Sequence, residues 1–166
     1  MPRFLCDLRF RCGHGIILSV IDMKRNLIAV LVLLAVVLSA CGGSVRGAVS
    51  REVPSELYTA DEIDSAVSAI KTEFSLSWSG CTLQEIAYAG DEMTGKSAEY
   101  YLREHYEDFS KSWGDFDELI VLISTFDVDE SGGDGSMVPN STYKDWNWIL
   151  VRSGGGSWRH VDHGYG

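Results

Sequence analysis

The most regular pattern in the chain is helical and begins at Thr59. Over 60–74, apolar residues recur at spacings of three and four, at Ile63, Ala66, Val67, Ile70 and Phe74. Thr59 and Glu62 have the spacing of a capping box, in which each side chain accepts a hydrogen bond from the other residue's backbone N–H. The pattern therefore predicts an amphipathic helix over 60–74 whose apolar face lies in a core.

Further along the chain, the pattern predicts a strand, a turn and a second helix. The strand is predicted over 81–89 and the turn over 91–96. Ser97 is placed to cap a helix over 98–110. One face of that helix would carry Tyr101, Leu102, His105 and Phe109.

Three more strands are predicted in the last third of the chain. Residues 118–127 contain a continuous apolar stretch, which is typical of a strand buried on both faces. Residues 142–152 alternate, with Trp146, Trp148 and Leu150 on one face and Tyr143, Asn147, Ile149 and Val151 on the other. Glycines 154–156 join this strand to a returning strand over 157–163, as in an antiparallel hairpin. The order α-β-α-β-β-β predicts an α+β fold, with one or two helices on a mostly antiparallel, curved four-stranded sheet.

A different pattern lies ahead of these elements. Residues 27–38 form an unbroken apolar run of 12 residues, preceded by Lys24 and Arg25. As a helix this run would rise about 18 Å, less than the ~30 Å hydrocarbon core of a bilayer. The run therefore has the length and flanking charge of the apolar region of a signal peptide.

The residues that follow, Leu38-Ser39-Ala40-Cys41, resemble the lipobox of bacterial lipoproteins. The resemblance implies cleavage between Ala40 and Cys41 and a diacylglyceryl group on the Cys41 sulfur. It also implies that the protein lies in the bacterial cell envelope, outside the cytoplasmic membrane. The expected organisation is a mis-called N-terminal extension at 1–22, a signal peptide at 23–40, a lipidated flexible tether at 41–56 and one α+β domain at 57–166.

Charge and cysteine content exclude some classes of partner, metal site and covalent cross-link. The formal net charge is −10, which argues against nucleic acid as a partner because phosphate binding needs a basic surface. Cys6, Cys12 and His14 precede the signal and lack the fourth ligand and the spacing of a zinc site. After Cys41 only Cys81 remains, so the mature chain would contain no internal disulfide and would depend on its core.

The predicted hairpin suggests a second resemblance. Residues 148–152, the glycine turn and residues 158–162 resemble the closing hairpin of NTF2-like or cystatin-like domains. The chain as a whole is also similar to small bacterial lipoproteins of no known activity. The NTF2-like resemblance implies a cone-shaped sheet with a pocket between sheet and helices. That family contains enzymes, binding modules and assembly domains, so the resemblance leaves function open.

Two groups of residues are candidates for binding. Aromatic side chains that either line a ligand cleft or simply fill the core are Tyr88, Tyr101, Trp146, Trp148 and Trp158. Asp127, Asp129 and Asp134 lie in a glycine-rich loop that begins like a calcium loop, but Val138 stands where a bidentate Glu is required. The alternative for this loop is a solvated connection, and weak calcium is the only cofactor that the sequence indicates.

A third group could carry chemistry. His160, Asp162 and His163, with His105, invite a metal or acid–base interpretation, in which alternation places His160 and Asp162 on one strand face and His163 on the other. Cys81 would act as a nucleophile only with a histidine beside it; otherwise it is a buried, inert thiol. The favoured hypothesis is a non-catalytic domain, held to the membrane by its lipid, that binds a small ligand or another envelope protein. The alternative is an enzyme with its active site in the cone pocket, near His160, Asp162 and Cys81.

Overall fold

The computed structural model describes residues 42–165. The elements are β1 (Val49–Arg51), α2 (Ala60–Ser77), β2 (Cys81–Tyr88), α3 (Asp91–Ala98), the π-helix η1 (Glu99–Glu104), α4 (Tyr106–Trp113), β3 (Glu118–Val128), β4 (Ser141–Arg152) and β5 (Arg159–Gly164). The predictions for the N-terminal extension, the signal peptide and Cys41 lie outside the described residues.

Helix α2 forms as the sequence predicts. The Thr59 backbone N–H donates to Glu62 Oε2 at 2.9 Å, and the Glu62 N–H donates to Thr59 Oγ1 at 3.3 Å, which confirms the capping box. The buried residues of the helix are the five predicted ones, Ile63, Ala66, Val67, Ile70 and Phe74. The helix continues one turn beyond 74 because Trp78 extends the apolar face to the next turn.

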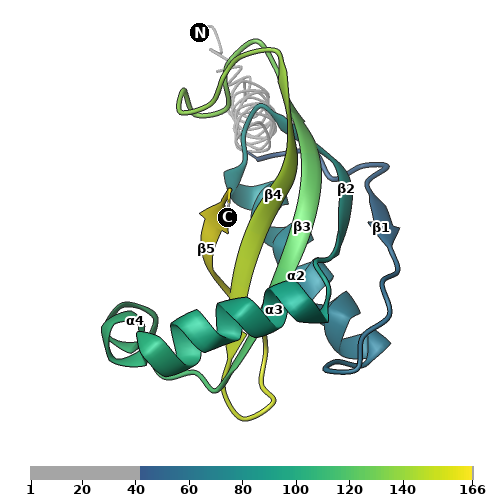
Figure 1. Cartoon of the computed structure of the whole chain (residues 1–166). Helices are drawn as coiled ribbons and strands as arrows, with labels where there is room; N and C mark the ends of the chain where they lie inside the picture. The colour runs from purple at the N-terminus through teal and green to yellow at the C-terminus, as the bar shows by residue number, and fades with distance from the viewer. Residues whose placement is uncertain (1–41, 166) are drawn as a thin grey trace, which may run out of the picture. The chain divides into compact units, whose positions relative to one another are not determined.

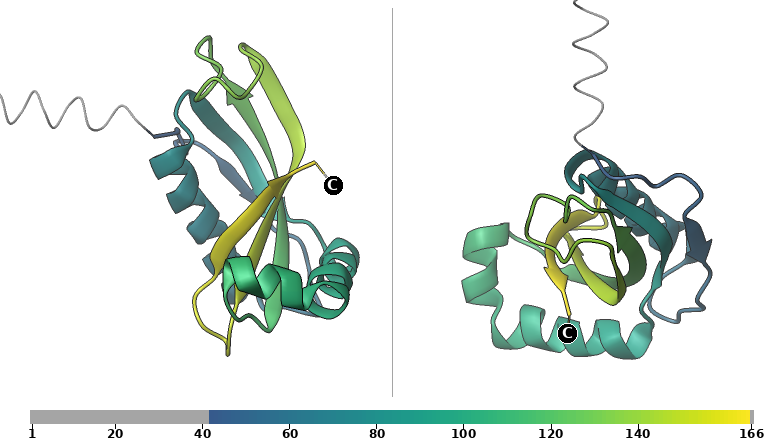
Figure 2. Two further views of the ribbon diagram at one scale, coloured as in Figure 1. Left: turned by 90° about the vertical axis from the view of Figure 1, so that its left-hand side faces the viewer. Right: turned by 90° about the horizontal axis from the view of Figure 1, so that it is seen from above.

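The sheet has five strands in the order β1-β2-β3-β4-β5, and β3 lies at its centre. The predicted burial of β3 on both faces is confirmed, because Ile120 and Leu122 belong to the core beneath α2 whereas Leu119 and Val121 belong to a second core on the other face. Helix α2 thus covers one face, and the segment from α3 to α4 crosses the opposite face (Figure 1, Figure 2). The α+β class is as predicted, but three α-helices within residues 42–165 cover the sheet on both sides.

The first strand, β1, lies in a segment that the sequence predicts to be a flexible tether. Residues 42–56 were expected to be a flexible tether, yet β1 pairs in parallel with β2, with Ser50 opposite Ile86. In two further backbone hydrogen bonds, the Gly43 N–H donates to the Phe74 carbonyl and the Leu83 N–H donates to the Ser44 carbonyl. The sheet is therefore mixed and five-stranded, because this segment supplies backbone hydrogen bonds to an edge that would otherwise be open.

The second helical region also differs from prediction. The expected turn at 91–96 is helix α3, and the expected single helix over 98–110 is divided into η1 and α4. Thr94 explains the first difference, since its side chain is buried and its hydroxyl accepts a hydrogen bond from the Val121 N–H. A contact with the sheet thus overrides the weak local pattern. The aromatic residues of η1 and α4 cover the second core, namely Tyr101, Tyr106, Phe109 and Trp113.

The predicted C-terminal hairpin is confirmed, since β4 and β5 pair antiparallel. Trp148 and Leu150 face α2, and Ile149 and Val151 face the second core, as alternation predicts. Tyr143 does not follow the predicted alternation. Two residues of β4, 144 and 145, lie opposite the single Thr125 of β3, and this bulge turns Tyr143 to the same face as Trp146.

One polar network joins the start of α2 to the sheet, and we call it the Arg152 network. Arg152 is buried, and its Nη2 donates to carboxylate oxygens of Glu62 and Glu118. Its guanidinium lies 4.2 Å from the centre of the Trp158 ring, and Trp158 Nε1 donates to the Glu62 carbonyl at 3.2 Å. Tyr58 completes the network, with its hydroxyl donating to the Leu119 carbonyl at 2.9 Å.

The Arg152 network shifts the ionisation of its members. Hydrogen bonds from Arg152 and Thr59 lower the pKa of Glu62 to about 2. Burial, with the nearby Glu118 charge, raises the pKa of Tyr58 to about 12. At neutral pH Glu62 is therefore ionised, Arg152 is charged and the Tyr58 phenol keeps its proton.

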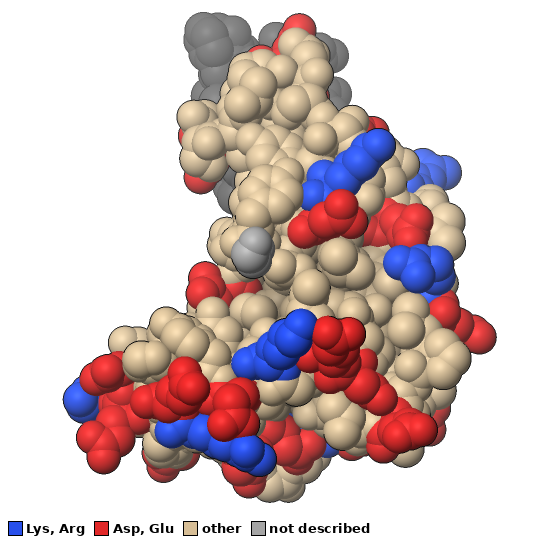
Figure 3. Space-filling view, viewed as in Figure 1, with Lys and Arg blue, Asp and Glu red and all other residues tan. Residues whose placement is uncertain are grey.

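The outer surface of the α3–α4 segment is charged. Carboxylates and cations alternate over this layer in Figure 3, and each of its three pairs is exposed: Glu92 with Lys96, Glu99 with Arg103, and Asp108 with Lys111. Exposed pairs of this kind contribute little to stability, because water and salt screen them. They are typical of the solvated side of an amphipathic layer.

Candidate functional site

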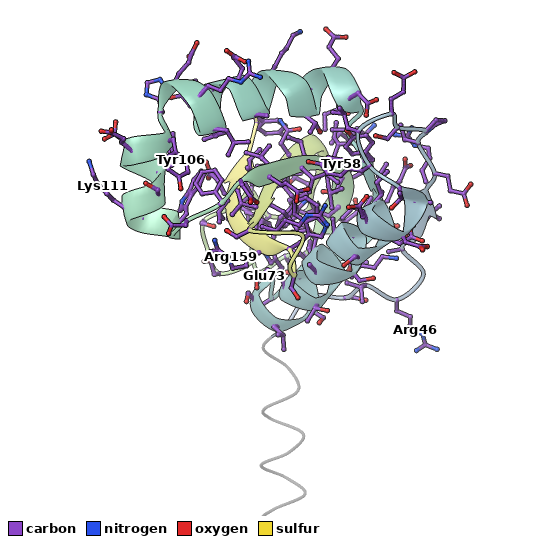
Figure 4. The ribbon with its side chains drawn as sticks, turned by 90° about the horizontal axis from the view of Figure 1, so that it is seen from below. Arg46, Tyr58, Glu73, Tyr106, Lys111 and Arg159 are labelled. Atoms are coloured by element: carbon purple, nitrogen blue, oxygen red, sulfur yellow. The ribbon has the colours of Figure 1, made fainter. Side chains whose placement is uncertain are left out.

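A cavity of about 220 Å³ opens at the C-terminal end of α2, between the start of β2, the β3–β4 loop and β5. We call it the histidine pocket. The side chains that define its chemistry are Glu73, Trp78, Cys81, Met137, His160 and His163. Figure 4 labels Glu73, which comes from the last turns of α2, and Tyr58, which precedes the helix.

The two histidines come together because β5 contains a bulge. Ile149 pairs with Asp162 and Leu150 with His160, so Val161 is an extra residue. The bulge places His160 and His163 on one face, with His163 Nδ1 3.2 Å from His160 Nε2. This corrects the prediction that His163 points away from His160, because one added residue reverses the alternation that follows it.

Asp162, which was predicted to share a face with His160, lies on the other side of β5. There it lines a second hollow with Tyr101 and Ile149, which His163 also borders. Its carboxylate accepts a hydrogen bond from the His163 backbone N–H at 2.8 Å. The predicted pairing of His160 with Asp162 on one face is therefore wrong.

Aromatic rings form the floor beneath the histidine pair. The Trp148 ring lies 5.2 Å from the His160 ring, and the Trp78 ring lies 5.1 Å from the His163 ring, measured between centroids. Trp148 itself donates from Nε1 to Ser124 Oγ at 2.8 Å. The indoles exclude water from one side of the imidazoles, and the other side of the histidine pair faces the pocket.

The environment keeps both imidazoles neutral at pH 7. Partial burial lowers the pKa of His160, and the neighbouring His163 lowers it further. Partial burial also lowers the pKa of His163. The carboxylates of Asp162 and Glu73 oppose both shifts by attracting the protonated rings. Neutral imidazoles keep a lone pair for a proton or a metal ion.

Cys81 lies on the same pocket wall with its thiol protonated. The residue is buried, as one alternative predicted, and its Sγ lies 3.9 Å from Met137 Sδ. Burial raises the pKa of this thiol, and the charges of Asp129 and Asp134 raise it further. A thiol in this state is a weak nucleophile.

The five candidate ligand-binding aromatics do not line one cleft. Tyr88, Trp148 and Trp158 are buried in the core beneath α2, and Trp146 packs against its edge. Tyr101 lies in the second core, on the opposite face of the sheet. The interpretation of these rings as core therefore fits the structure better than a shared groove.

The three candidate calcium ligands are engaged separately. Asp127 accepts from Gln84 Nε2 and Thr142 Oγ1 across the sheet, whereas Asp129 accepts from Ser131 and Asp134 from the Ser136 N–H. Each carboxylate thus accepts hydrogen bonds from different residues, and the three do not share a partner. Among residues 42–165, no three His, Cys, Asp or Glu side chains gather closely enough to hold a metal ion. His105 packs against Tyr100 and Phe109, on the layer opposite the pocket.

Sequence reasoning missed Glu73, Trp78 and Met137 as pocket residues. Trp78 had a usable signal, since it follows Phe74 by four residues and continues the apolar face of α2. Glu73 lies outside the apolar face of α2, and Met137 lies in the irregular loop between β3 and β4. Hydrophobic periodicity therefore does not indicate either residue.

Within the part of the chain that the structure describes, no helix has the length and apolar character needed to cross a membrane. The chain matches no protein-family model, no curated protein sequence and no solved structure.

Proposed function

We propose that this protein is a bacterial envelope lipoprotein whose folded domain is a non-catalytic binding module. The observation that carries the proposal is the Leu38-Ser39-Ala40-Cys41 box directly after a 12-residue apolar run. Diacylglyceryl modification would attach two acyl chains to Cys41, and two chains give stable anchoring where one does not. The domain would then lie outside the cytoplasmic membrane, tethered through its N-terminus.

The histidine pocket supports the binding part of the proposal. It is a preformed hollow of about 220 Å³ in which apolar side chains such as Trp78 and Met137 lie beside several polar ones such as Glu73, which could orient a small ligand. The partner would be a small ligand at this pocket, or an envelope protein that covers it. The neutral histidines and the protonated thiol suit binding better than nucleophilic attack.

Mass spectrometry of the protein from a bacterial membrane fraction tests the anchor. We expect a mature N-terminus at Cys41, with the mass of the lipid on that residue. Cys41→Ala should abolish both processing and membrane attachment, whereas the matched Cys81→Ala variant should be processed and anchored like the parent. An unmodified Cys41, or a Cys41→Ala protein that is still processed and anchored, would contradict the proposal.

One observation favours a second candidate, an enzyme. Cys81, His160 and His163 line the same pocket, as a cysteine nucleophile and its base would. The raised pKa of the Cys81 thiol argues against it, since such enzymes lower that pKa. The rate at which iodoacetamide alkylates the Cys81 thiol at pH 7 distinguishes the binding module from the enzyme. Cys41 does not react because its sulfur carries the lipid. A binding module should react at least tenfold more slowly when folded than in urea, and faster alkylation of the folded protein, lost in His160→Gln, would favour the enzyme.

A further inference from the structure

We propose that His160 Nε2 and His163 Nδ1 chelate one divalent transition-metal ion, for which Zn²⁺ is the first probe. The inference names a ligand for the histidine pocket and so rests on the binding function proposed above. It requires neither the lipid nor the membrane.

The distance between the two ring nitrogens supports a chelate. Two nitrogens that bind one tetrahedral ion at 2.0–2.1 Å lie about 3.3–3.4 Å apart. His160 Nε2 and His163 Nδ1 are 3.2 Å apart and share a hydrogen bond. An ion that binds both nitrogens displaces the shared proton, which the second nitrogen of the same ring can carry, and the two nitrogens move apart by only a few tenths of an ångström. The β5 bulge at Val161 creates this spacing, because without it the two rings would project from opposite faces of the strand.

The surroundings hold the pair in place. His160 packs on Trp148 and His163 on Trp78, which restricts both rings before any ion binds. The Asp162 carboxylate fixes the backbone at His163 through a 2.8 Å hydrogen bond. Preorganised ligands of this kind lose little conformational freedom on binding, which favours affinity.

The remaining coordination positions face the pocket. Residues 42–165 contain no third His, Cys, Asp or Glu placed with the pair to complete a site, so water fills the other positions. Glu73 lines the same pocket, and its carboxylate is one source of a third contact, direct or through water. A two-histidine site with open positions leaves room for a small anionic ligand on the ion.

The donor chemistry selects the class of ion. Imidazole nitrogen suits Zn²⁺, Ni²⁺ and Cu²⁺, whereas Ca²⁺ and Mg²⁺ prefer sets of oxygen ligands. The site therefore differs from the predicted calcium loop at Asp127–Asp134 in both position and ion. Zn²⁺ should bind in the presence of excess Ca²⁺ and Mg²⁺.

The test is a calorimetric titration of the full-length chain in detergent with Zn²⁺. All variants carry Cys6→Ser, Cys12→Ser and His14→Gln, which removes metal donors ahead of the lipobox. We expect one ion per chain, at least tenfold weaker binding in His160→Gln and in His163→Gln, and no binding in the double variant. Glu73→Gln should weaken binding less than either histidine variant, and the control His105→Gln should bind like the parent.

Tryptophan fluorescence gives an independent readout, because Trp148 and Trp78 lie beside the pair. Cu²⁺ should quench the emission of the parent at one equivalent, and the double histidine variant should lose this quenching. Zn²⁺ binding that persists in the double variant, binding that is lost only in Cys81→Ser, or no binding by a parent with a native circular dichroism spectrum would overturn the proposal. Metal binding is measured independently of the mass of the mature N-terminus, so failure of the metal site can be distinguished from failure of the lipid anchor.

Discussion

The two ends of α2 hold ionisable side chains in contrasting ways. At the N-terminal end, Arg152 is bound by Glu62 and Glu118 and covered by Trp158, so its charge is compensated within the protein. At the C-terminal end, His160 and His163 have each other and a hollow of about 220 Å³. The same helix therefore ends in a structural network on one side and in an open hollow lined by two histidines on the other.

The contrast follows from where each group lies relative to water. Arg152 is buried, and a buried charge is tolerated only when protein groups compensate it. The histidine rings are only partly buried at the edge of the pocket, so they can remain neutral without a complete set of partners. A buried cation held by two carboxylates is typical of a structural network, whereas a partly buried histidine pair beside a hollow is a candidate binding site.

The largest expected effect comes from opening the Arg152 network. Arg152→Leu leaves two carboxylates without their cation and should lower the free energy of unfolding by about 2–3 kcal/mol in urea denaturation. Lys144→Leu, an exposed change on the same strand, should stay within about 0.5 kcal/mol of the parent.

Adding Glu62→Gln and Glu118→Gln to Arg152→Leu sharpens the test. Because the cost arises from unpaired carboxylates, the triple variant should recover part of the lost stability. An Arg152→Leu protein as stable as the parent would show that the network is not structural and would remove the contrast between the two ends.

A smaller effect is expected from the histidine pair on acidification. Both folded pKa values lie below the ordinary 6.5, so in the window below pH 6.5 the unfolded chain binds protons that the folded chain does not. Stability should be retained above that pH and fall as the pH drops through it. Thermal melts with a chelator present should give a lower Tm at pH 5.5 than at pH 7.5.

The matched variants assign this pH dependence to one end of the helix. His160→Gln with His163→Gln should reduce the fall in Tm, whereas Arg152→Leu should shift the whole curve and leave the fall unchanged. If the Arg152→Leu variant instead lost the pH dependence, the two ends would not titrate independently.

An effect confined to alkaline pH is expected from Tyr58. Its folded pKa of about 12 lies above the ordinary value of 10.0, so the unfolded chain releases this proton first. Stability should therefore fall as the pH rises from about 10 towards 12, and Tyr58→Phe should make the fall shallower. Tyr100→Phe, an exposed tyrosine, should keep the parent's slope, and equal slopes in all three proteins would contradict the burial of Tyr58 in the network.

The sequence alone was enough to predict the elements whose periodicity is strong. The capped helix α2 with its buried face, the doubly buried strand β3 and the C-terminal hairpin all follow from local spacing. A helix cap and an apolar repeat are properties of neighbouring residues, so they survive folding with little change. The weaker pattern at 91–96 predicts a turn, whereas the structure has a helix there with Thr94 bound to β3, a contact that local spacing does not reveal.

Tertiary structure decided the candidate site. The bulge at Val161 depends on how β5 pairs with β4, and that one extra residue brings His160 and His163 to the same face. The pocket around them also needs Glu73 from α2, Cys81 from β2 and Met137 from a loop, which are distant in sequence. Alternation predicts faces only for an unbroken strand, because each inserted residue reverses every side chain that follows it.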